Sequence, residues 1–187
     1  FVNAEQVVNT CLILKENSRV DYQDYAEIYQ LMILHKTDVK EKQFEKTQIQ
    51  NAFLPQVHAM AQSAFDRAKL KQLNLPSLIT ANSRSFACNN FVTVCLNKLT
   101  TLQGESTFSN CPMLNTFIAI NLLQINSKCF AYCKKLVAVI APKASISNQA
   151  FRYCTDLHTV LVQTSEFTCS CDYCPKCKGY FQECLRC

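Results

Sequence analysis

The chain has 187 residues and a net charge of +5, with 2 glycines, 5 prolines and 13 cysteines. So little glycine and proline excludes a collagen-like chain and disfavours a disordered, low-complexity one. No apolar run approaches the roughly 20 residues of a transmembrane helix, so we expect no transmembrane segment in this sequence. The lysines are scattered and accompany no Arg-rich helix or aromatic stacking motif, so we expect no nucleic-acid partner.

A short pattern recurs along the chain, and each copy begins with an aromatic residue. Phe108, Phe130 and Phe151 are each followed by Cys at +3, Leu at +6, and apolar residues at +9 and +11. Matching aromatics stand 21 to 22 residues apart towards the N-terminus, at Tyr22, Phe44, Phe65 and Phe86. A fixed period of this length predicts a solenoid whose turns bury their core against one another. The array is expected over residues 1–165 as about seven and a half repeats, with a tail at 166–187. Because the first repeat is truncated, we expect further turns or a cap before Phe1 to cover an open strand edge.

Each repeat is expected to supply one short strand and one return segment. Val139 and Ala141 lie two residues apart, so they share the inward face of a strand, while Ala138 and Ile140 point outward. The five-residue offset from Ile125 to Phe130 is not a strand period and indicates a short helical or turn-like return.

Stacked turns place equivalent residues in columns, and three columns are predicted to form the core. The first is the aromatic column Tyr22, Phe44, Phe65, Phe86, Phe108, Phe130 and Phe151. The second comprises Val8, Ile28, Ile49, Leu70, Phe91, Leu114, Leu136 and Leu157. The third comprises Cys11, Leu31, Ala52, Leu73, Val94, Phe117, Val139 and Val160.

The repeat pattern Ile-x4-Phe-x2-Cys-x2-Leu-x2-Val-x-Ala resembles the BspA-like class of leucine-rich repeats. The resemblance implies a leucine-rich repeat solenoid, a β-rich α/β superhelix. It would carry one short parallel strand per repeat on the concave face and short helical or turn-like segments on the convex face. It also implies a non-catalytic module that binds a protein or cell-surface ligand, commonly in adhesion. Members include surface proteins of bacteria and microbial eukaryotes, so the resemblance implies surface exposure or secretion; a cytoplasmic location stays open.

Outward-facing strand positions form two further rows, which we interpret as the candidate ligand-binding face. One row, from Thr10 to Thr159, is mostly hydroxyl and amide side chains, and the other, from Leu12 to Leu161, is mostly apolar. The candidates are Met32, Phe53, Thr93, Thr116, Ile118, Ile140, Thr159 and Leu161. An exposed apolar stripe indicates an interaction site. The alternative is that another segment covers the stripe or that both strand faces are buried.

The cysteines fall into two groups. Cys88, Cys111, Cys133 and Cys154 are assigned to the matched repeat position, where a buried thiol acts as a small apolar side chain. The tail contains Cys169, Cys171, Cys174, Cys177, Cys184 and Cys187. Two Cys-x2-Cys pairs can supply four thiolates to a structural zinc ion. The same run suits three disulfides in an extracellular module, and the sequence leaves both alternatives open.

Two other functions compete with a binding array. In one, a zinc-stabilised tail carries a regulatory or interaction function and the array is only a spacer. In the other, a cysteine-dependent enzyme would need His35, His58 or His158 beside a thiol. The repeat places these histidines at unrelated positions, and the sequence has no phosphate loop or metalloprotease motif, so we assign no catalytic residue.

Overall fold

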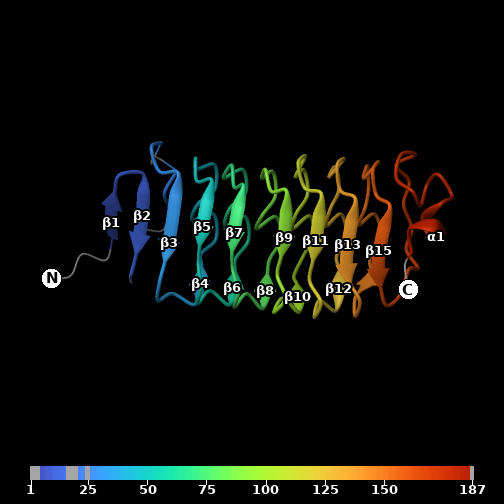
Figure 1. Ribbon diagram of the computed structural model, residues 1–187, viewed down its shortest axis with the longest axis horizontal. Helices are drawn as coiled ribbons and strands as arrows, with labels where there is room; N and C mark the ends of the chain where they lie inside the picture. Colours follow the sequence, from blue (N-terminus) through green and yellow to red (C-terminus); the bar gives the residue numbers. More distant parts are fainter. Residues whose placement is uncertain (1–4, 16–20, 24–25, 186–187) are drawn as a thin grey trace.

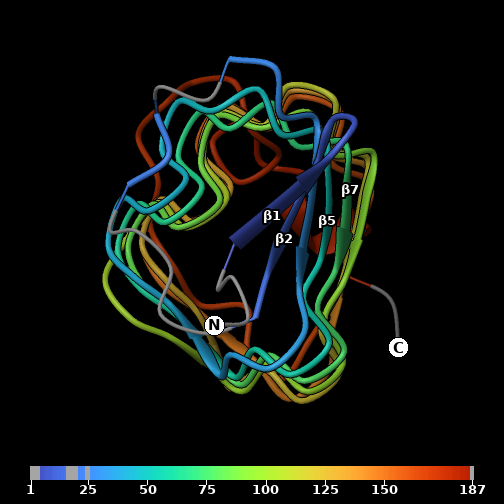
Figure 2. The same ribbon diagram turned by 90° about the vertical axis from the view of Figure 1, so that its left-hand side faces the viewer.

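The computed structural model describes residues 5–15, 21–23 and 26–185. Its turns stack into a rod, with β1 (Glu5–Val8) near one end and the tail at the other (Figure 1). Along the rod axis, successive turns follow nearly the same closed path around a common interior (Figure 2). The predicted solenoid is therefore confirmed.

The predicted strands form a first row along one side of the rod. They are β2 (Cys11–Leu14), β3 (Gln30–Ile33), β5 (Asn51–Phe53), β7 (Gln72–Asn74), β9 (Thr93–Cys95), β11 (Thr116–Ile118), β13 (Ala138–Ala141) and β15 (Thr159–Val162). Neighbours from β2 onward pair in parallel, in one sheet ending at β7 and another running from β9 to β15.

A second row of two-residue strands lies on the return path, which the sequence analysis did not anticipate. It contains β4 (Asp38–Val39), β6 (Ala59–Met60), β8 (Thr80–Ala81), β10 (Thr101–Leu102), β12 (Gln124–Ile125) and β14 (Ser145–Ile146). These strands also pair in parallel. The expectation of one strand per repeat is therefore wrong.

The return segments are turns, and the helical alternative is wrong for the described repeats. Their backbone N–H groups alternate between two acceptors: one donates to the next turn of the solenoid, and the following one donates three residues back within its own turn, as Ala131 N–H does to the Lys128 carbonyl at 3.0 Å. Phe130 N–H, for example, donates to the carbonyl of Ala150 at 2.9 Å. Because a helix needs those donors for its own i→i−4 bonds, inter-turn bonding and helix formation exclude each other here. Among the described residues, helix occurs in the tail as α1 (Phe181–Cys184).

The aromatic column is confirmed. From Tyr22 to Phe151, successive rings stack with centroids 5.0 to 6.3 Å apart and interplanar angles of 5° to 18°. All of these side chains are buried. Parallel displaced rings at this separation interact favourably beyond the burial of their area.

The predicted register holds from β3 to β7 and from β9 to β15, and it is wrong at the N-terminal end. Leu12, not Cys11, pairs with Leu31 and is buried, so Thr10, Cys11 and Leu12 do not occupy their predicted positions. Val8 is also outside the core, with 44% of its surface exposed. The cause is a hairpin: β1 runs antiparallel to β2, and Asn9 in the tight connection has a φ of 53°. A reversal in place of a stacked turn shifts the register by one residue, and β1 covers the edge of β2 that was predicted to be open.

From the turn of Phe44 to that of Phe151, the backbone is left-handed at two places, two residues before and two residues after the aromatic residue. At these positions φ lies between 52° and 65°, although glycine occupies none of them. The N–H group two residues after the aromatic donates to a carbonyl of the next turn, as Tyr132 does to Arg152 at 2.8 Å. Inter-turn hydrogen bonds therefore hold a conformation that non-glycine residues disfavour.

The copy beginning at Phe86 is one residue short, and Asn89 rather than Cys88 occupies its +3 position, so the assignment of Cys88 is wrong. The Asn89 side chain donates to the carbonyls of Phe65 and Phe86 at 2.8 and 3.1 Å and accepts from Leu70 N–H at 2.8 Å. In the next copies a thiol takes this role, as Cys133 does by donating to the Phe108 carbonyl at 3.1 Å.

Candidate functional site

The candidate binding residues all lie on the outward face of the first strand row. Met32 and Phe53 are register partners on β3 and β5. On the second sheet, the register aligns Thr93, Thr116 and Thr159 in one row and Ile118, Ile140 and Leu161 in the other. These side chains are half-buried or exposed, and Phe53 has 40% of its surface exposed. The tail lies at the end of the rod and does not extend along these rows (Figure 1).

Neither outward row carries a charge. The polar row reads Gln30, Asn51, Gln72, Thr93, Thr116, Ala138 and Thr159, and the other reads Met32, Phe53, Asn74, Cys95, Ile118, Ile140 and Leu161. The whole chain is 18% charged, so the face is depleted of charge. Depletion of charged residues characterises the buried centre of protein–protein interfaces.

Described residues line two hollows on this strand face. One, of about 400 Å³, lies over β3, β5 and β7 and is lined by Gln30, Met32, Asn51, Phe53 and Gln72, among others. The second, of about 370 Å³, lies where β7 and β9 belong to different sheets, and Leu73, Pro76, Cys95 and Lys98 help to line it. Sequence reasoning predicted neither hollow.

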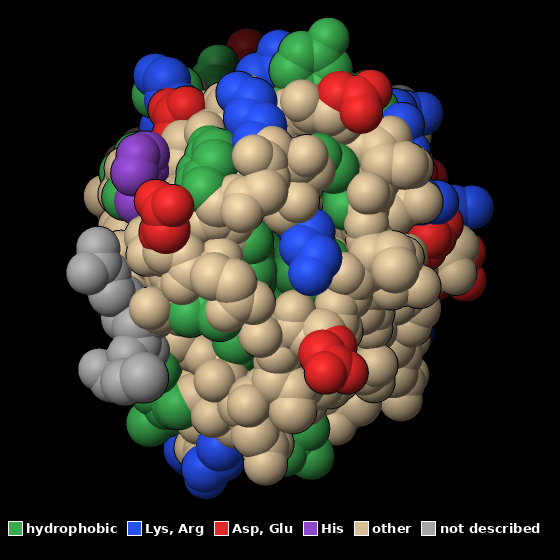
Figure 3. All heavy atoms as spheres, turned by 90° about the vertical axis from the view of Figure 1, so that its right-hand side faces the viewer, with side chains coloured by type: hydrophobic (Ala, Val, Ile, Leu, Met, Phe, Trp, Pro, Cys, Tyr) green, Lys and Arg blue, Asp and Glu red, His purple; other side chains and the backbone are tan. Residues whose placement is uncertain are grey.

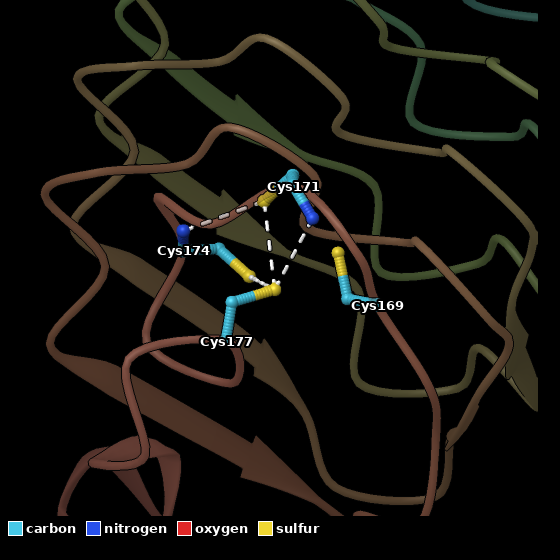
Figure 4. A group of neighbouring side chains, drawn as sticks. All are labelled: Cys169, Cys171, Cys174 and Cys177. Atoms are coloured by element: carbon cyan, nitrogen blue, oxygen red, sulfur yellow. Dashed lines mark hydrogen bonds between the residues drawn. The ribbon is translucent and has the colours of Figure 1, made fainter.

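The tail brings together four of the six cysteines that were expected to bind a metal or form disulfides. The sulfur atoms of Cys169, Cys171, Cys174 and Cys177 all lie within 4.8 Å of one another, and Figure 4 shows them facing a common centre. We call these residues the thiol cluster. Cys184 lies elsewhere, where its thiol donates to the carbonyl of Leu157 at 3.3 Å. Cys187 lies outside the described residues.

The dimensions of the thiol cluster fit a four-thiolate metal site. A tetrahedral zinc ion with Zn–S bonds of about 2.3 Å separates its sulfurs by about 3.8 Å. Cys171 and Cys177 have their sulfurs 3.8 Å apart, and Cys174 and Cys177 have theirs 3.6 Å apart. Each sulfur has three sulfur neighbours, whereas a disulfide needs only one. The cluster can therefore hold a metal ion.

Backbone N–H groups point at the sulfurs. Cys171 Sγ accepts from Tyr153 and Cys174 at 3.3 and 3.4 Å, and Cys177 Sγ accepts from Cys171 N–H at 3.3 Å. Burial raises the pKa of the Cys171 thiol, but N–H donors from Tyr153, Tyr173 and Cys174 outweigh burial and lower this pKa to about 6. Burial and the adjacent thiols raise the pKa of Cys174 to about 11. The site thus stabilises one thiolate, while the accumulated negative charge of further thiolates would need a cation to offset it.

Aromatic residues on both sides of the thiol cluster pack on the last ring of the array, a contact that sequence reasoning missed. Phe181 stacks on Phe151 with centroids 6.2 Å apart, and Phe167 meets Phe151 edge-on at 6.0 Å. The signal was present, because Phe181-x2-Cys184 repeats the Phe-x2-Cys spacing of the array.

The three histidines considered for catalysis, His35, His58 and His158, are all exposed. Across the described residues, no helix combines the length and apolar character needed to cross a membrane.

The sequence matches the BspA type Leucine rich repeat region in 6 copies over residues 37–158, well over half of the chain. The structure is similar to the crystal structure of a leucine-rich repeat protein of T. pallidum, with a TM-score of 0.70 and 19% identity. That match covers 96% of this chain and 92% of the other. It is also similar to a leucine-rich repeat protein of Eubacterium ventriosum, with a TM-score of 0.54 and 12% identity over 81% of this chain and 48% of that one. No curated protein matches in sequence. The repeats and their stacking agree with one assignment: the chain belongs to the BspA-type leucine-rich repeat family.

Proposed function

We propose that the chain is a non-catalytic binding module that holds a protein ligand on the outward face of its first strand row. The observation that carries this proposal is the pair of uncharged rows, one polar and one apolar, which run side by side along β3 to β15. Apolar side chains contribute burial and the adjacent hydroxyl and amide groups contribute directional hydrogen bonds.

The chemistry of this face favours an uncharged polypeptide surface over a nucleic acid. Nucleic-acid binding derives much of its affinity from lysine and arginine contacts to phosphates, and neither row contains such a residue. The family and fold are typically non-catalytic, which agrees with a binding function. Because family members include surface proteins, we place this function at a cell surface or outside the cell, and surface labelling of intact expressing cells tests that location.

The binding proposal is tested with a peptide library as the probe. Random peptides displayed on phage are selected against the immobilised full chain, and the enriched peptides are titrated against Ile118→Glu/Ile140→Glu. The matched control is Ile120→Glu/Leu123→Glu, which adds the same charge at exposed apolar residues outside the two rows, since Ile120 and Leu123 are 42% and 59% exposed.

We expect the enriched peptides to lose at least tenfold in affinity for the strand-face variant and to bind the control as they bind the wild type. Circular dichroism should show both variants folded. Equal binding to both variants, or a selection without enrichment, would refute the proposal. Unfolding of the strand-face variant alone would show that these side chains belong to the core.

The geometry of the thiol cluster favours a second function, and we propose that it binds one zinc ion as a structural metal. Four soft sulfur ligands in a tetrahedral arrangement suit zinc or iron, and zinc needs no redox chemistry to remain bound. Cys169, Cys171, Cys174 and Cys177 would be the ligands. Titration of reduced, metal-free chain with Zn²⁺ should saturate at one ion per chain, and Cys174→Ser should abolish tight binding. Preferential retention of iron, or disulfides among these four cysteines in the isolated chain, would refute the assignment.

A further inference from the structure

The hydrogen-bond pattern between turns continues past the last repeat and into the thiol cluster. In five successive turns, the N–H group two residues after the aromatic donates to a carbonyl of the following turn at 2.8 to 3.0 Å. The donors are Lys46, Arg67, Cys88, Asn110 and Tyr132. The next donor in the series is Tyr153, and its acceptor is the sulfur of Cys171 at 3.3 Å. A cysteine sulfur therefore replaces the carbonyl oxygen of a further turn.

Other tail contacts also reproduce those of a stacked turn. Gln149 N–H donates to the Thr168 carbonyl at 2.7 Å, just as Ser106 N–H donates to the Ser127 carbonyl two turns earlier. On the strand side, Leu185 forms a parallel bridge with Val160 of β15. The tail thus satisfies backbone groups on both sides of the last turn.

Side-chain stacking continues in the same direction. Phe181 adds a ring to the aromatic column at Phe151. On the surface, Tyr173 from the loop of the thiol cluster stacks on Tyr153 at 5.2 Å, and Tyr153 stacks on Tyr132 at 4.6 Å. The tail covers the end of the apolar core, since the C-terminal end of the rod shows mainly backbone and polar or charged side chains (Figure 3).

The segment that makes these contacts has little regular structure of its own. The residues from Phe167 to Tyr180 contain no described strand or helix, and the following helix α1 has four residues. Without a bound cation, hydrogen bonds and ring contacts alone join this loop to the last turn. A metal ion would join the two sides of the loop through four bonds.

We infer that zinc held by Cys169, Cys171, Cys174 and Cys177 fastens the tail as a metal-dependent cap on the last turn of the solenoid. This inference rests on the zinc site proposed above. Metal binding orders the segment that accepts the Tyr153 N–H group and covers Phe151, and metal loss opens that end of the rod. Terminal caps with a polar outer face are a general need of repeat arrays, and here the cap is conditional on a metal.

Hydrogen exchange followed by mass spectrometry tests the inference on the full, reduced chain. Exchange is compared for zinc-loaded wild type, wild type stripped with a chelator, and Cys174→Ser. The matched control is Cys95→Ser, since Cys95 is an exposed thiol on the strand face far from the tail. We expect amides of residues 145–160 to exchange at least tenfold faster in the stripped chain and in Cys174→Ser. Amides of residues 60–90 should not change, and Cys95→Ser should behave as wild type.

A second variant separates the cap from the metal site. Phe181→Ala keeps all four ligands but removes the ring that covers Phe151, so zinc stoichiometry should stay at one while exchange in residues 145–160 rises. If zinc binds at one per chain but its removal leaves exchange unchanged, the cap inference is overturned and the zinc site stands. If the chain binds no zinc, the zinc site itself fails. If metal removal speeds exchange equally along the whole array, the metal does not act through a local cap.

Discussion

Replacement of Phe130 by alanine tests the stacked core most directly. Phe130 is fully buried, and its ring stacks between Phe108 and Phe151 at 5.9 and 5.8 Å and meets Phe117 edge-on at 4.8 Å. Phe→Ala in a core costs about 3 to 5 kcal/mol, depending on how far the surroundings collapse into the cavity. Collapse is restricted here, because backbone bonds such as Phe108 N–H to the Cys129 carbonyl at 3.0 Å hold the turns at a fixed spacing. We therefore expect a cost in the upper part of that range.

Urea denaturation followed by circular dichroism measures this loss in free energy of unfolding. For a domain of this size, about 4 to 5 kcal/mol corresponds to a fall in melting temperature of roughly 8 to 20 °C. Phe130→Leu should cost far less, since it retains most of the apolar volume. Phe53→Ala is the exposed control, and its cost should be less than half that of Phe130→Ala. A loss below about 1 kcal/mol for Phe130→Ala would refute the claim that the column carries the stability of the rod.

Three further predictions concern the buried polar groups and thiols. Asn89→Ala should lower the free energy of unfolding by about 2 kcal/mol in urea, because it leaves the buried Leu70 N–H group without its acceptor and removes the side-chain bonds to the Phe65 and Phe86 carbonyls; an unchanged midpoint would contradict this. In the folded chain, iodoacetamide should modify exposed Cys95 and leave buried Cys133 intact, as peptide mass spectrometry can show, and equal labelling would be the contrary result. Burial raises the pKa of Cys111, Cys129 and Cys133 above the ordinary 9.0. Their contribution to stability is therefore complete below pH 9 and is lost as pH rises, because the unfolded chain then releases protons that the folded chain retains. Above pH 9 the free energy of unfolding should fall by at most about 1.4 kcal/mol per pH unit for each thiol, measured by urea denaturation at a series of pH values. A free energy of unfolding that does not change with pH would contradict this.

Much of the array could be predicted from the sequence, because a repeat places chemically equivalent residues in equivalent surroundings. The spacing of the aromatics was sufficient to place Tyr22 through Phe151 in one column. The two-residue period of the strands was sufficient to orient Ile118 and Ile140 outward. Both conclusions depend on the same residue spacing repeated in many copies. An irregular copy therefore misplaces only its own residues.

The wrong predictions concern segments that depart from this spacing. The reversal at Asn9 shifted the register of Cys11 by one residue. In the shortened copy that begins at Phe86, Asn89 rather than Cys88 occupies the +3 position. The second strand row was not foreseen because two-residue strands are too short to show a period.

For the tail, the sequence alone predicted a metal site or disulfides among six closely spaced cysteines. Tertiary structure decided which four meet, since the grouping of Cys169 with Cys177 depends on how the loop folds back on the last turn. Only the structure placed the Tyr153 N–H group against Cys171 and the Phe181 ring over Phe151. The physical reason is that periodicity specifies contacts between like positions of successive turns. The contacts that end the array join unlike segments, and they depend on the path of the chain through space.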